Sequence, residues 1–168
     1  GANALQVWAY HDSDAYRGEF IVRNNRFYGS QDHRFNDVIE GRMNTERRGG
    51  FVKNSAIHGN YLAYANDDLI EIDGGQQNVL VYDNELIQGY TGISIAPNLL
   101  GPSYLFHNFI HNLGDDRGKE WTAIKAGGLM SKPAGQTFIF ENFIDVQRNG
   151  IAASKVVGDS TFWVNTKN

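Results

Sequence analysis

The sequence predicts an all-β solenoid, a parallel β-helix of about five to six coils, and three observations lead to it. A six-residue phrase returns along nearly the whole chain, a second short apolar strand lies between its copies, and helical periodicity is weak throughout. Units that recur every 20 to 50 residues or so are typical of repeat architectures. The 19 glycines against three prolines, with 12% aromatic residues, suit many short strands joined by tight turns.

The recurring phrase is an apolar residue, then an asparagine three positions later, then another apolar residue two positions further on. We assign six copies, with central positions at Asn25, Ser55, Asn84, Asn108, Asn142 and Asn165, the last one truncated. An inward asparagine can bond both the turn that carries it and the amide of the next coil, so we expect these side chains to form a buried ladder. Ser55 interrupts the series of asparagines, so we expect the buried backbone groups of that coil to have fewer hydrogen-bond partners.

The second strand is centred on an isoleucine in each repeat, at positions 39, 70, 93, 124 and 151. Stacked coils bring each residue over its equivalent at about 4.8 Å. The alignment therefore places Glu40, Glu71, Ser94, Lys125 and Ala152 in one outward column on adjacent coils. Repeat length varies between 23 and 34 residues, so we expect the inserts 31–50 and 114–118 to leave the stack as mobile surface loops.

The pattern resembles the right-handed parallel β-helix superfamily, which includes pectate lyases, polygalacturonases, alginate and chondroitin lyases and phage tailspikes. The resemblance covers Val22 to Asn165 and rests on the asparagine phrase and on the run Asn66-Asp67-Asp68-Leu69-Ile70-Glu71-Ile72-Asp73-Gly74-Gly75. The same run is also similar to one found in large, mostly uncharacterised bacterial β-helix proteins. The resemblance implies right-handed coils and favours an extracellular or periplasmic location. A left-handed β-helix would need hexapeptide regularity, which coils of 23 to 34 residues contradict.

Composition limits the binding partners and the kinds of catalytic or metal site that this chain can have. The net charge of −4, with both signs mixed along the chain, lacks the basic face of a nucleic-acid binder. No apolar run approaches the ~20 residues of a membrane helix. The absence of cysteine removes disulfides, thiol nucleophiles and thiolate metal sites, and the five scattered histidines do not predict zinc. We expect one domain, residues 1–168, which could be a segment of a longer β-helix. With no terminal cap recognised, its coils could also stack end to end on another copy.

The outward column is the candidate site, because enzymes of the resembling superfamily use such columns. The catalytic candidates are Glu71, Asp68, Asp67 and Lys125, and the substrate-binding candidates are Glu40, Arg42, Ser94 and Asp73. Hydrolysis would need one protonated and one ionised carboxylate. Elimination from a uronate would need a base such as Lys125, with Asp67, Asp68 and Asp73 as oxygen ligands for Ca²⁺. No other cofactor or metal is expected.

Two functions remain open at this point. The first is action on an extracellular or cell-wall polysaccharide, by hydrolysis or by lyase elimination. The alternative is a non-catalytic segment, structural or carbohydrate-binding, of a larger protein or assembly. The His-containing and Arg-x-Lys phrases of the polygalacturonases are missing, and paired aspartates before a strand often bond their own turn. The deciding observation is whether Glu40, Asp67, Asp68, Glu71 and Lys125 converge.

Overall fold

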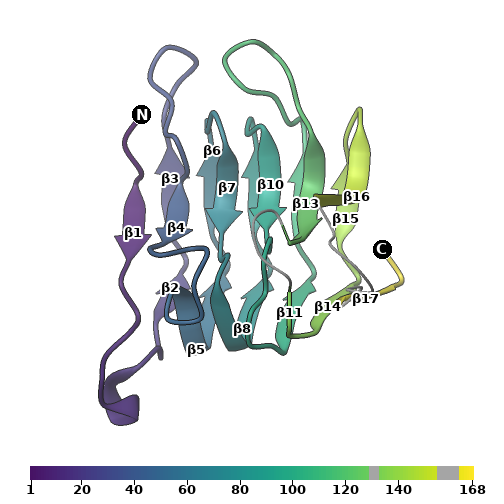
Figure 1. Ribbon diagram of the computed structural model, residues 1–168. Coiled ribbons are helices and arrows are strands. Elements are labelled where there is room, and N and C mark those ends of the chain that lie inside the picture. The colour runs from purple at the N-terminus through teal and green to yellow at the C-terminus, as the bar shows by residue number, and fades with distance from the viewer. Residues whose placement is uncertain (129–132, 155–162) are drawn as a thin grey trace.

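The computed structural model describes residues 1–128, 133–154 and 163–168, and over these residues the chain winds as a parallel β-helix (Figure 1). In the described residues each of the first five coils gives one strand to each of three sheets, the last coil gives a strand to two of them, and every pairing between named strands is parallel. None of the described helices is long and apolar enough to cross a membrane.

Sheet A contains β1 (Leu5–Val7), β4 (Ile39–Gly41), β7 (Asp68–Glu71), β10 (Thr91–Ser94), β13 (Thr122–Gly127) and β16 (Asn149–Ser154). Sheet B contains β2 (Ile21–Arg23), β5 (Gly50–His58), β8 (Gly75–Tyr82), β11 (Ser103–Phe106), β14 (Thr137–Phe140) and β17 (Trp163–Thr166). Sheet C contains β3 (Arg26–Tyr28), β6 (Tyr61–Ala63), β9 (Glu85–Ile87), β12 (Phe109–His111) and β15 (Phe143–Asp145). A single 3₁₀ turn, η1 (Asp14–Tyr16), lies between β1 and β2.

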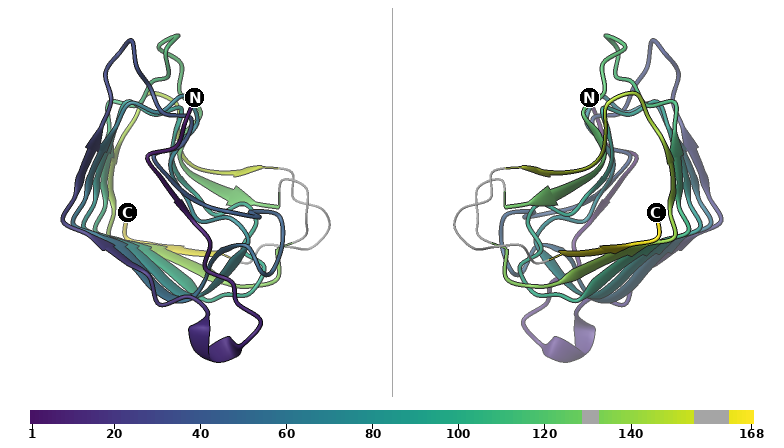
Figure 2. Two further views of the ribbon diagram at one scale, coloured as in Figure 1. Left: turned by 90° about the vertical axis from the view of Figure 1, so that its left-hand side faces the viewer. Right: turned by 90° about the vertical axis from the view of Figure 1, so that its right-hand side faces the viewer.

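Seen from the N-terminal end, the chain runs clockwise through sheets A, B and C as it recedes (Figure 2). The coils are therefore right-handed, which is the hand favoured for parallel crossovers. The core lies inside the coil and consists of aliphatic stacks. In sheet B the aligned residues are Val22, Ile57, Val81, Leu105 and Ile139. The last four are completely buried, and stability in such a stack is a sum over neighbouring coils.

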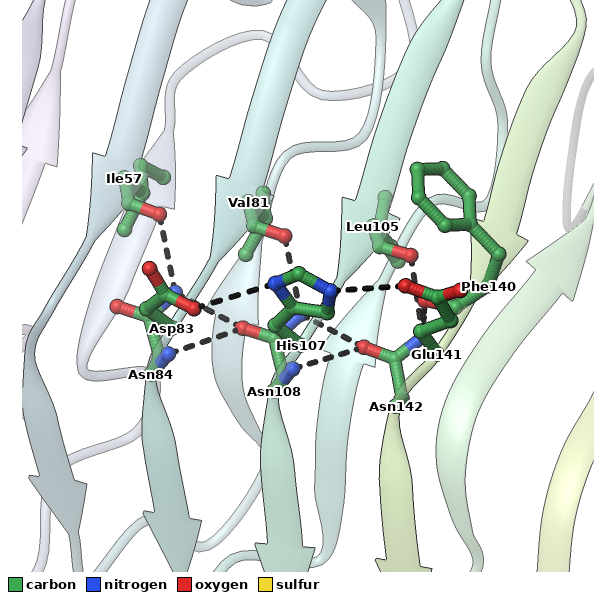
Figure 3. A network of polar contacts seen from close by, with 10 residues as sticks. All are labelled: Ile57, Val81, Asp83, Asn84, Leu105, His107, Asn108, Phe140, Glu141 and Asn142. Carbon is green, nitrogen blue, oxygen red and sulfur yellow. Dashed lines mark hydrogen bonds and ion pairs between the residues drawn. The ribbon is translucent and has the colours of Figure 1, made fainter. Parts of the chain in front are cut away.

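The asparagine ladder exists, but two of its predicted rungs are wrong. The rungs are Asn25, Asn60, Asn84, Asn108, Asn142 and Asn168. At each inner rung the side-chain oxygen accepts from both the backbone and the side-chain amide of the preceding rung, and the side-chain amide donates to a carbonyl of the preceding coil (Figure 3).

Ser55 and Asn165 are not rungs, because local spacing misled the alignment. Ser55 lies inside the long strand β5 and pairs with Val79, while the true phrase follows it as Ile57, Asn60 and Leu62. Asn165 pairs with Ile139 within sheet B. Asn25 was expected to be buried but is exposed, since it belongs to the first coil, although it still bonds Asn60. The coil of Ser55 therefore has a complete rung.

The predicted loop 31–50 is also wrong in part. Ile39–Gly41 forms the regular strand β4, paired with β1 and β7, so the insert divides into two separate loops, 29–38 and 42–49. Residues 114–118 form no strand, as expected. The mobility of these loops stays a prediction.

Arg34 fastens the first of these loops to the coils. Its Nη1 donates to the carbonyl oxygens of Ala65, Gln88 and Gly114, at 3.2, 3.0 and 2.9 Å, on three successive coils. Its guanidinium also lies over the ring of Tyr64, 5.2 Å from the centroid. This clamp fixes the segment that leads into Asp37, three residues further on.

Candidate functional site, an acidic cluster on sheet A

The column predicted from the sequence has the predicted register. Glu40, Glu71, Ser94, Lys125 and Ala152 align strand by strand across sheet A, and Gln6 of β1 precedes Glu40. The side chains of the column are nevertheless mostly inaccessible to solvent. Glu71 and Lys125 are each only 8% exposed, and Ser94 is fully buried. The candidate site is thus a largely buried polar cluster at the sheet, with Glu40 half-buried at its N-terminal end.

Lys125 and Asp68 form the centre of the cluster, although they lie two coils apart. Lys125 Nζ donates to Asp68 Oδ2 at 2.6 Å, and both side chains are nearly inaccessible to solvent. Burial alone would lower the pKa of Lys125, but the charges of Asp68 and Asp73 outweigh it and raise that pKa above its ordinary value. Lys125 is therefore held as a cation.

Asp37 and Asp67 extend the cluster beside Asp68. Asp37 Oδ1 accepts the backbone N–H of Asp68 at 3.1 Å, and Asn36 donates to Asp37 Oδ2 at 2.7 Å. Burial, with the charge of Asp68 added, raises the pKa of Asp37 to about 7. Desolvation of its carboxyl, with the charge of Asp68 added, raises the pKa of Asp67 to about 6 against the lowering effect of Lys125, although the residue as a whole remains exposed. Both carboxyls therefore exchange protons near neutral pH.

Among the cluster carboxyls whose pKa is raised, Glu71 has the highest value. Burial first, then the charges of Asp73, Asp68 and Asp37, raises the pKa of Glu71 to about 10. Asn44, from the loop 42–49, donates to Glu71 Oε1 at 2.9 Å. A carboxyl with this pKa carries its proton at neutral pH, so Glu71 is a proton donor beside groups that are wholly or partly ionised.

Asp73, which follows β7, bonds the end of β10 and the turn after it on the next coil. Its Oδ1 accepts from Ser94 Oγ at 2.7 Å and from the backbone N–H of Ala96 at 2.6 Å. Burial raises the pKa of Asp73 to about 6, and the charge of Lys125 opposes the rise. Asp73 and Ser94 thus have structural partners, as the non-catalytic interpretation expects of turn residues.

The predicted residues other than Arg42 come together. Glu40 accepts hydrogen bonds from Asn3 and, at 2.6 Å, from Gln6. Arg42 instead lies over the ring of Trp8, 5.8 Å from its centroid, and contacts no cluster carboxylate among the described residues. The residues assigned to the site that do converge are Glu71, Asp68, Asp67, Lys125, Glu40, Ser94 and Asp73.

Sequence reasoning missed Asp37 and Asn44. Asp37 precedes Val38-Ile39 as Asp68 precedes Leu69-Ile70, so the alignment of the isoleucine strands contained the signal for it. Nothing in the repeat pattern marks Asn44, because it lies in an insert that only one coil carries.

The cluster also has hydrogen-bonding capacity that the described residues leave unused. Asp68 Oδ1 and Thr91 Oγ1 are buried without a hydrogen-bond partner. They belong to residues that pair in register across β7 and β10. Such groups are rare in native interiors and mark polar sites under constraint.

A Ca²⁺ site at this place fits the donor set poorly. Carboxylate oxygens of Asp37, Glu40 and Glu71, and likewise of Asp37, Asp67 and Asp68, lie within 4.8 Å of one another. Ca²⁺ needs about six to eight oxygen ligands. Here Lys125 already supplies a cation to Asp68, and Glu71 retains its proton at neutral pH. Asp73, another of the expected ligands, is committed to Ser94 and Ala96.

In comparisons with known proteins, no family model, no curated protein and no solved structure matches this chain. Functional inference therefore depends on the geometry of the cluster and on the fold.

Proposed function

We propose that the protein is carbohydrate-active and hydrolyses glycosidic bonds in an extracellular or cell-wall polysaccharide, with the acidic cluster of sheet A as its catalytic site. One observation carries the proposal: a single cluster holds carboxyls with different pKa values, Glu71 at about 10 and Asp67 at about 6, and each of them lies close to Asp37. Titratable groups whose environments push their pKa values apart are the usual basis for acid and base roles.

In this proposal Glu71 donates a proton to the departing glycosidic oxygen. Asp67, the exposed carboxylate of the cluster, acts on the opposite side, either on a water molecule or on the sugar itself. The charges of Asp37 and Lys125 form part of the electrostatic environment of Glu71 and Asp67. Asn44 orients the Glu71 carboxyl through its hydrogen bond to Oε1.

The ion pair between Lys125 and Asp68 favours hydrolysis over elimination. A lyase base must be neutral to take a proton from the sugar. Lys125 is hydrogen-bonded to Asp68 at 2.6 Å, and its pKa is raised, so it is a poor base at neutral pH. Its role in the proposal is to compensate the charge of Asp68.

The fold supports the substrate class by analogy. The right-handed coils and the asparagine ladder resemble the superfamily of pectate lyases and polygalacturonases, and we propose membership on that resemblance. An analogy of fold alone does not imply function, which is why the proposal depends on the cluster.

A second candidate is a non-catalytic β-helix segment. The observation that favours it is the use of the carboxylates of Asp37 and Asp73 to bond backbone N–H groups of neighbouring coils. In that case the cluster is a buried polar contact that aligns sheet A, and any carbohydrate would be bound without being cleaved.

The experiment is a panel of pectic, alginate, glycosaminoglycan and neutral cell-wall polymers, followed both by new reducing ends and by the absorbance of unsaturated products. The proposal expects reducing ends without unsaturated products, and loss of activity in Asp67→Asn. The matched control, Asp116→Asn, removes an exposed aspartate outside the cluster and should retain activity. Unsaturated products would contradict hydrolysis. The absence of any product with wild-type protein would favour the non-catalytic candidate.

A further inference from the structure

The outward surface of sheet B is rich in apolar side chains. In β2, β5, β8, β11 and β14 the residues that alternate with the buried core point away from the coil and align across the strands in two rows. The first row is Ile21, Ala56, Leu80, Tyr104 and Phe138, and the second is Arg23, His58, Tyr82, Phe106 and Phe140. We call these two rows the sheet B face. An outward row that faces water is ordinarily polar.

The rings of the second row stack on one another along the coil axis. The centroid of the Tyr82 ring is 4.5 Å from that of His58 and 4.9 Å from that of Phe106. Phe106 stacks in turn on Phe140 at 5.1 Å, and no interplanar angle in the row exceeds 4°. Because neighbours cover both faces of each inner ring, these half-buried rings present their edges outward. The sheet B face is therefore a continuous apolar surface.

No second layer covers this surface in the part of the chain that the structure describes. Figure 2 shows the outside of sheet B free of other strands, with only the 3₁₀ turn η1 near its N-terminal end. Ile21, at that end of the first row, is 64% exposed. Contiguous exposed apolar surfaces mark sites where another molecule binds.

The sheet B face has a polar rim. Exposed side chains lie two residues before the first row or one residue after the second, namely Asn54, Asn78, Gln136, Asp83, His107 and Glu141. An apolar centre within a polar rim is the usual anatomy of a protein–protein interface. Four rows of side chains on five strands spaced at about 4.8 Å cover roughly 600 Å². Two such surfaces would bury about 1,200 Å², which is the lower end for specific interfaces.

A second copy of this chain matches the face in its period. Ring edges recur along the face at the strand spacing of about 4.8 Å. A partner with the same spacing can place its own side chains between them at every strand, and two sheets that interdigitate in this way pack about 10 Å apart. Another stack of parallel coils has that spacing, whereas a helix or an irregular segment does not.

The charges at the two ends of the face select the orientation of the second copy. Arg23 is exposed on the first coil and forms no ion pair with the described residues. Glu141 is exposed on the fifth coil, where its Oε2 contacts His107 at 2.9 Å. With antiparallel coil axes, Arg23 of each copy meets Glu141 of the other. With parallel axes it would meet Ile21 of the other copy, which offers no charge.

We propose that the sheet B face binds a second copy of this chain, with the coil axes antiparallel, to form a two-fold dimer. Such an interface is isologous, since both copies use the same surface. The central strand β8 lies at the two-fold axis, so Leu80 and Tyr82 occupy the centre of the contact. The acidic cluster belongs to sheet A, so this inference is independent of the proposed catalysis.

The first arm of the test is sedimentation velocity over a range of protein concentrations. The wild-type protein should show monomer and dimer in an equilibrium that dilution shifts toward the monomer. Leu80→Lys places a charge at the centre of the face and should weaken dimerisation at least tenfold. Because Leu80 is half-buried and its substitution can disturb folding, the second arm uses exposed residues only.

The second arm reverses the charges at the two ends of the face. Arg23→Glu and Glu141→Arg should each weaken dimerisation at least tenfold, since like charges then meet at both ends of the contact. An equimolar mixture of the two variants should form a dimer again, because opposite charges meet at both ends of the mixed pair. The matched control, Arg26→Glu, reverses an exposed charge of the same coil on sheet C and should leave dimerisation unchanged.

Wild-type protein that stays monomeric at every concentration overturns the proposal. A dimer that Leu80→Lys leaves intact also overturns it, as do charge variants whose mixture fails to dimerise. Open-ended growth of the mass that these variants do not reduce assigns the association to the ends of the coils and likewise contradicts a dimer through the sheet B face.

Discussion

Glu71 and Asp37 are carboxyls that the fold keeps from ionising, and this has a consequence for stability. Their pKa values in the folded protein, about 10 and about 7, lie above those of an unfolded chain. The native state therefore holds protons that the unfolded state releases. The stability from these groups is fully present near pH 4 and is lost as the pH rises through their folded pKa values.

We therefore predict that the free energy of unfolding falls between pH 5 and pH 8. Each pKa unit corresponds to about 1.4 kcal/mol, so the decrease should be on the order of a few kcal/mol. Asp37→Asn should make the dependence shallower between pH 5 and pH 7, where Glu71 still contributes, and exposed Asp32→Asn should keep the wild-type slope. Urea denaturation across this range provides the measurement, and a stability that rises with pH would contradict the assignment. The lowered pKa of Asp115 acts only in more acidic solution.

The buried pair of Lys125 and Asp68 should show its contribution when it is broken. Lys125→Met leaves the Asp68 carboxylate buried without its partner, which typically costs about 3–5 kcal/mol. The double variant Lys125→Met with Asp68→Asn should recover part of this loss, since the unpaired charge is gone. Chemical denaturation of the single and double variants tests the coupling, and additive effects would show that the two side chains do not act as a pair.

At the residue scale, the sequence was sufficient for the register of the site and insufficient for its burial. The isoleucine of each repeat anchors the strand, so the positions of Glu40, Glu71 and Lys125 follow from counting. Burial depends on inserts such as the loop carrying Asn44, whose path no repeat specifies. The expectation that Lys125 could be a base did not consider its ion pair with Asp68, because Asp68 is 57 positions away in sequence.

At the scale of the element, the asparagine ladder joins the turns between sheets B and C. Asn108 Nδ2 donates to Val81 O and to Asn142 Oδ1, both at 2.9 Å, and its Oδ1 accepts from Asn84. A second row of polar contacts lies next to it, in which His107 contacts Glu141 at 2.9 Å and Asp83 at 3.6 Å (Figure 3). The inner rungs of the asparagine ladder, Asn60, Asn84, Asn108 and Asn142, are buried, whereas the side chains of the second row are exposed.

Asn108→Ala should leave buried backbone groups unpaired and reduce stability by about 1–3 kcal/mol. His107→Ala, at the exposed neighbour, should cost less, since exposed ion pairs contribute about 0–1 kcal/mol. Thermal or urea denaturation of the two variants makes the comparison. An Asn108→Ala protein as stable as wild type would contradict the role of the ladder.

The errors at Ser55 and Asn165 have one physical cause. The phrase depends on three positions only. Residues inside a strand of sheet B can therefore match it by chance, as Ser55 does in the long strand β5 and Asn165 does in β17. The correct choice requires the pairing of β5 with β8, which places Ser55 opposite Val79. Pairing between coils is not visible within a single repeat.

At the scale of the whole molecule, the parallel β-helix was predictable because the turn phrase and the isoleucine strand recur in successive coils, although two strands per repeat were expected and a full coil has three. The strands of sheet C are three residues long and contain the last apolar residue of the phrase, so the sequence marks their position but not that they form a third sheet, and no repeat specifies the path of the inserts. In the described residues the outer edges of the first and last strands of each sheet pair with no other strand.

Such unpaired edges are templates for further pairing, by another coil or by a second copy of the chain. We propose that the protein associates end to end through them. Sedimentation equilibrium should show an average mass that rises with protein concentration. A monomeric mass at all concentrations would contradict end-to-end association.

The central claim is that Glu71 donates the proton in hydrolysis, and the most direct measurement is kcat/KM of Glu71→Gln on the polymer that the wild-type protein cleaves. Glutamine keeps the shape and the hydrogen bond to Asn44 but has no proton to transfer. Loss of a general acid costs about 10²–10⁴-fold. We predict a reduction of this size with an unchanged melting temperature. The control Glu46→Gln, at a half-buried residue outside the cluster, should stay near wild type. A Glu71→Gln protein with wild-type kcat/KM would contradict the account.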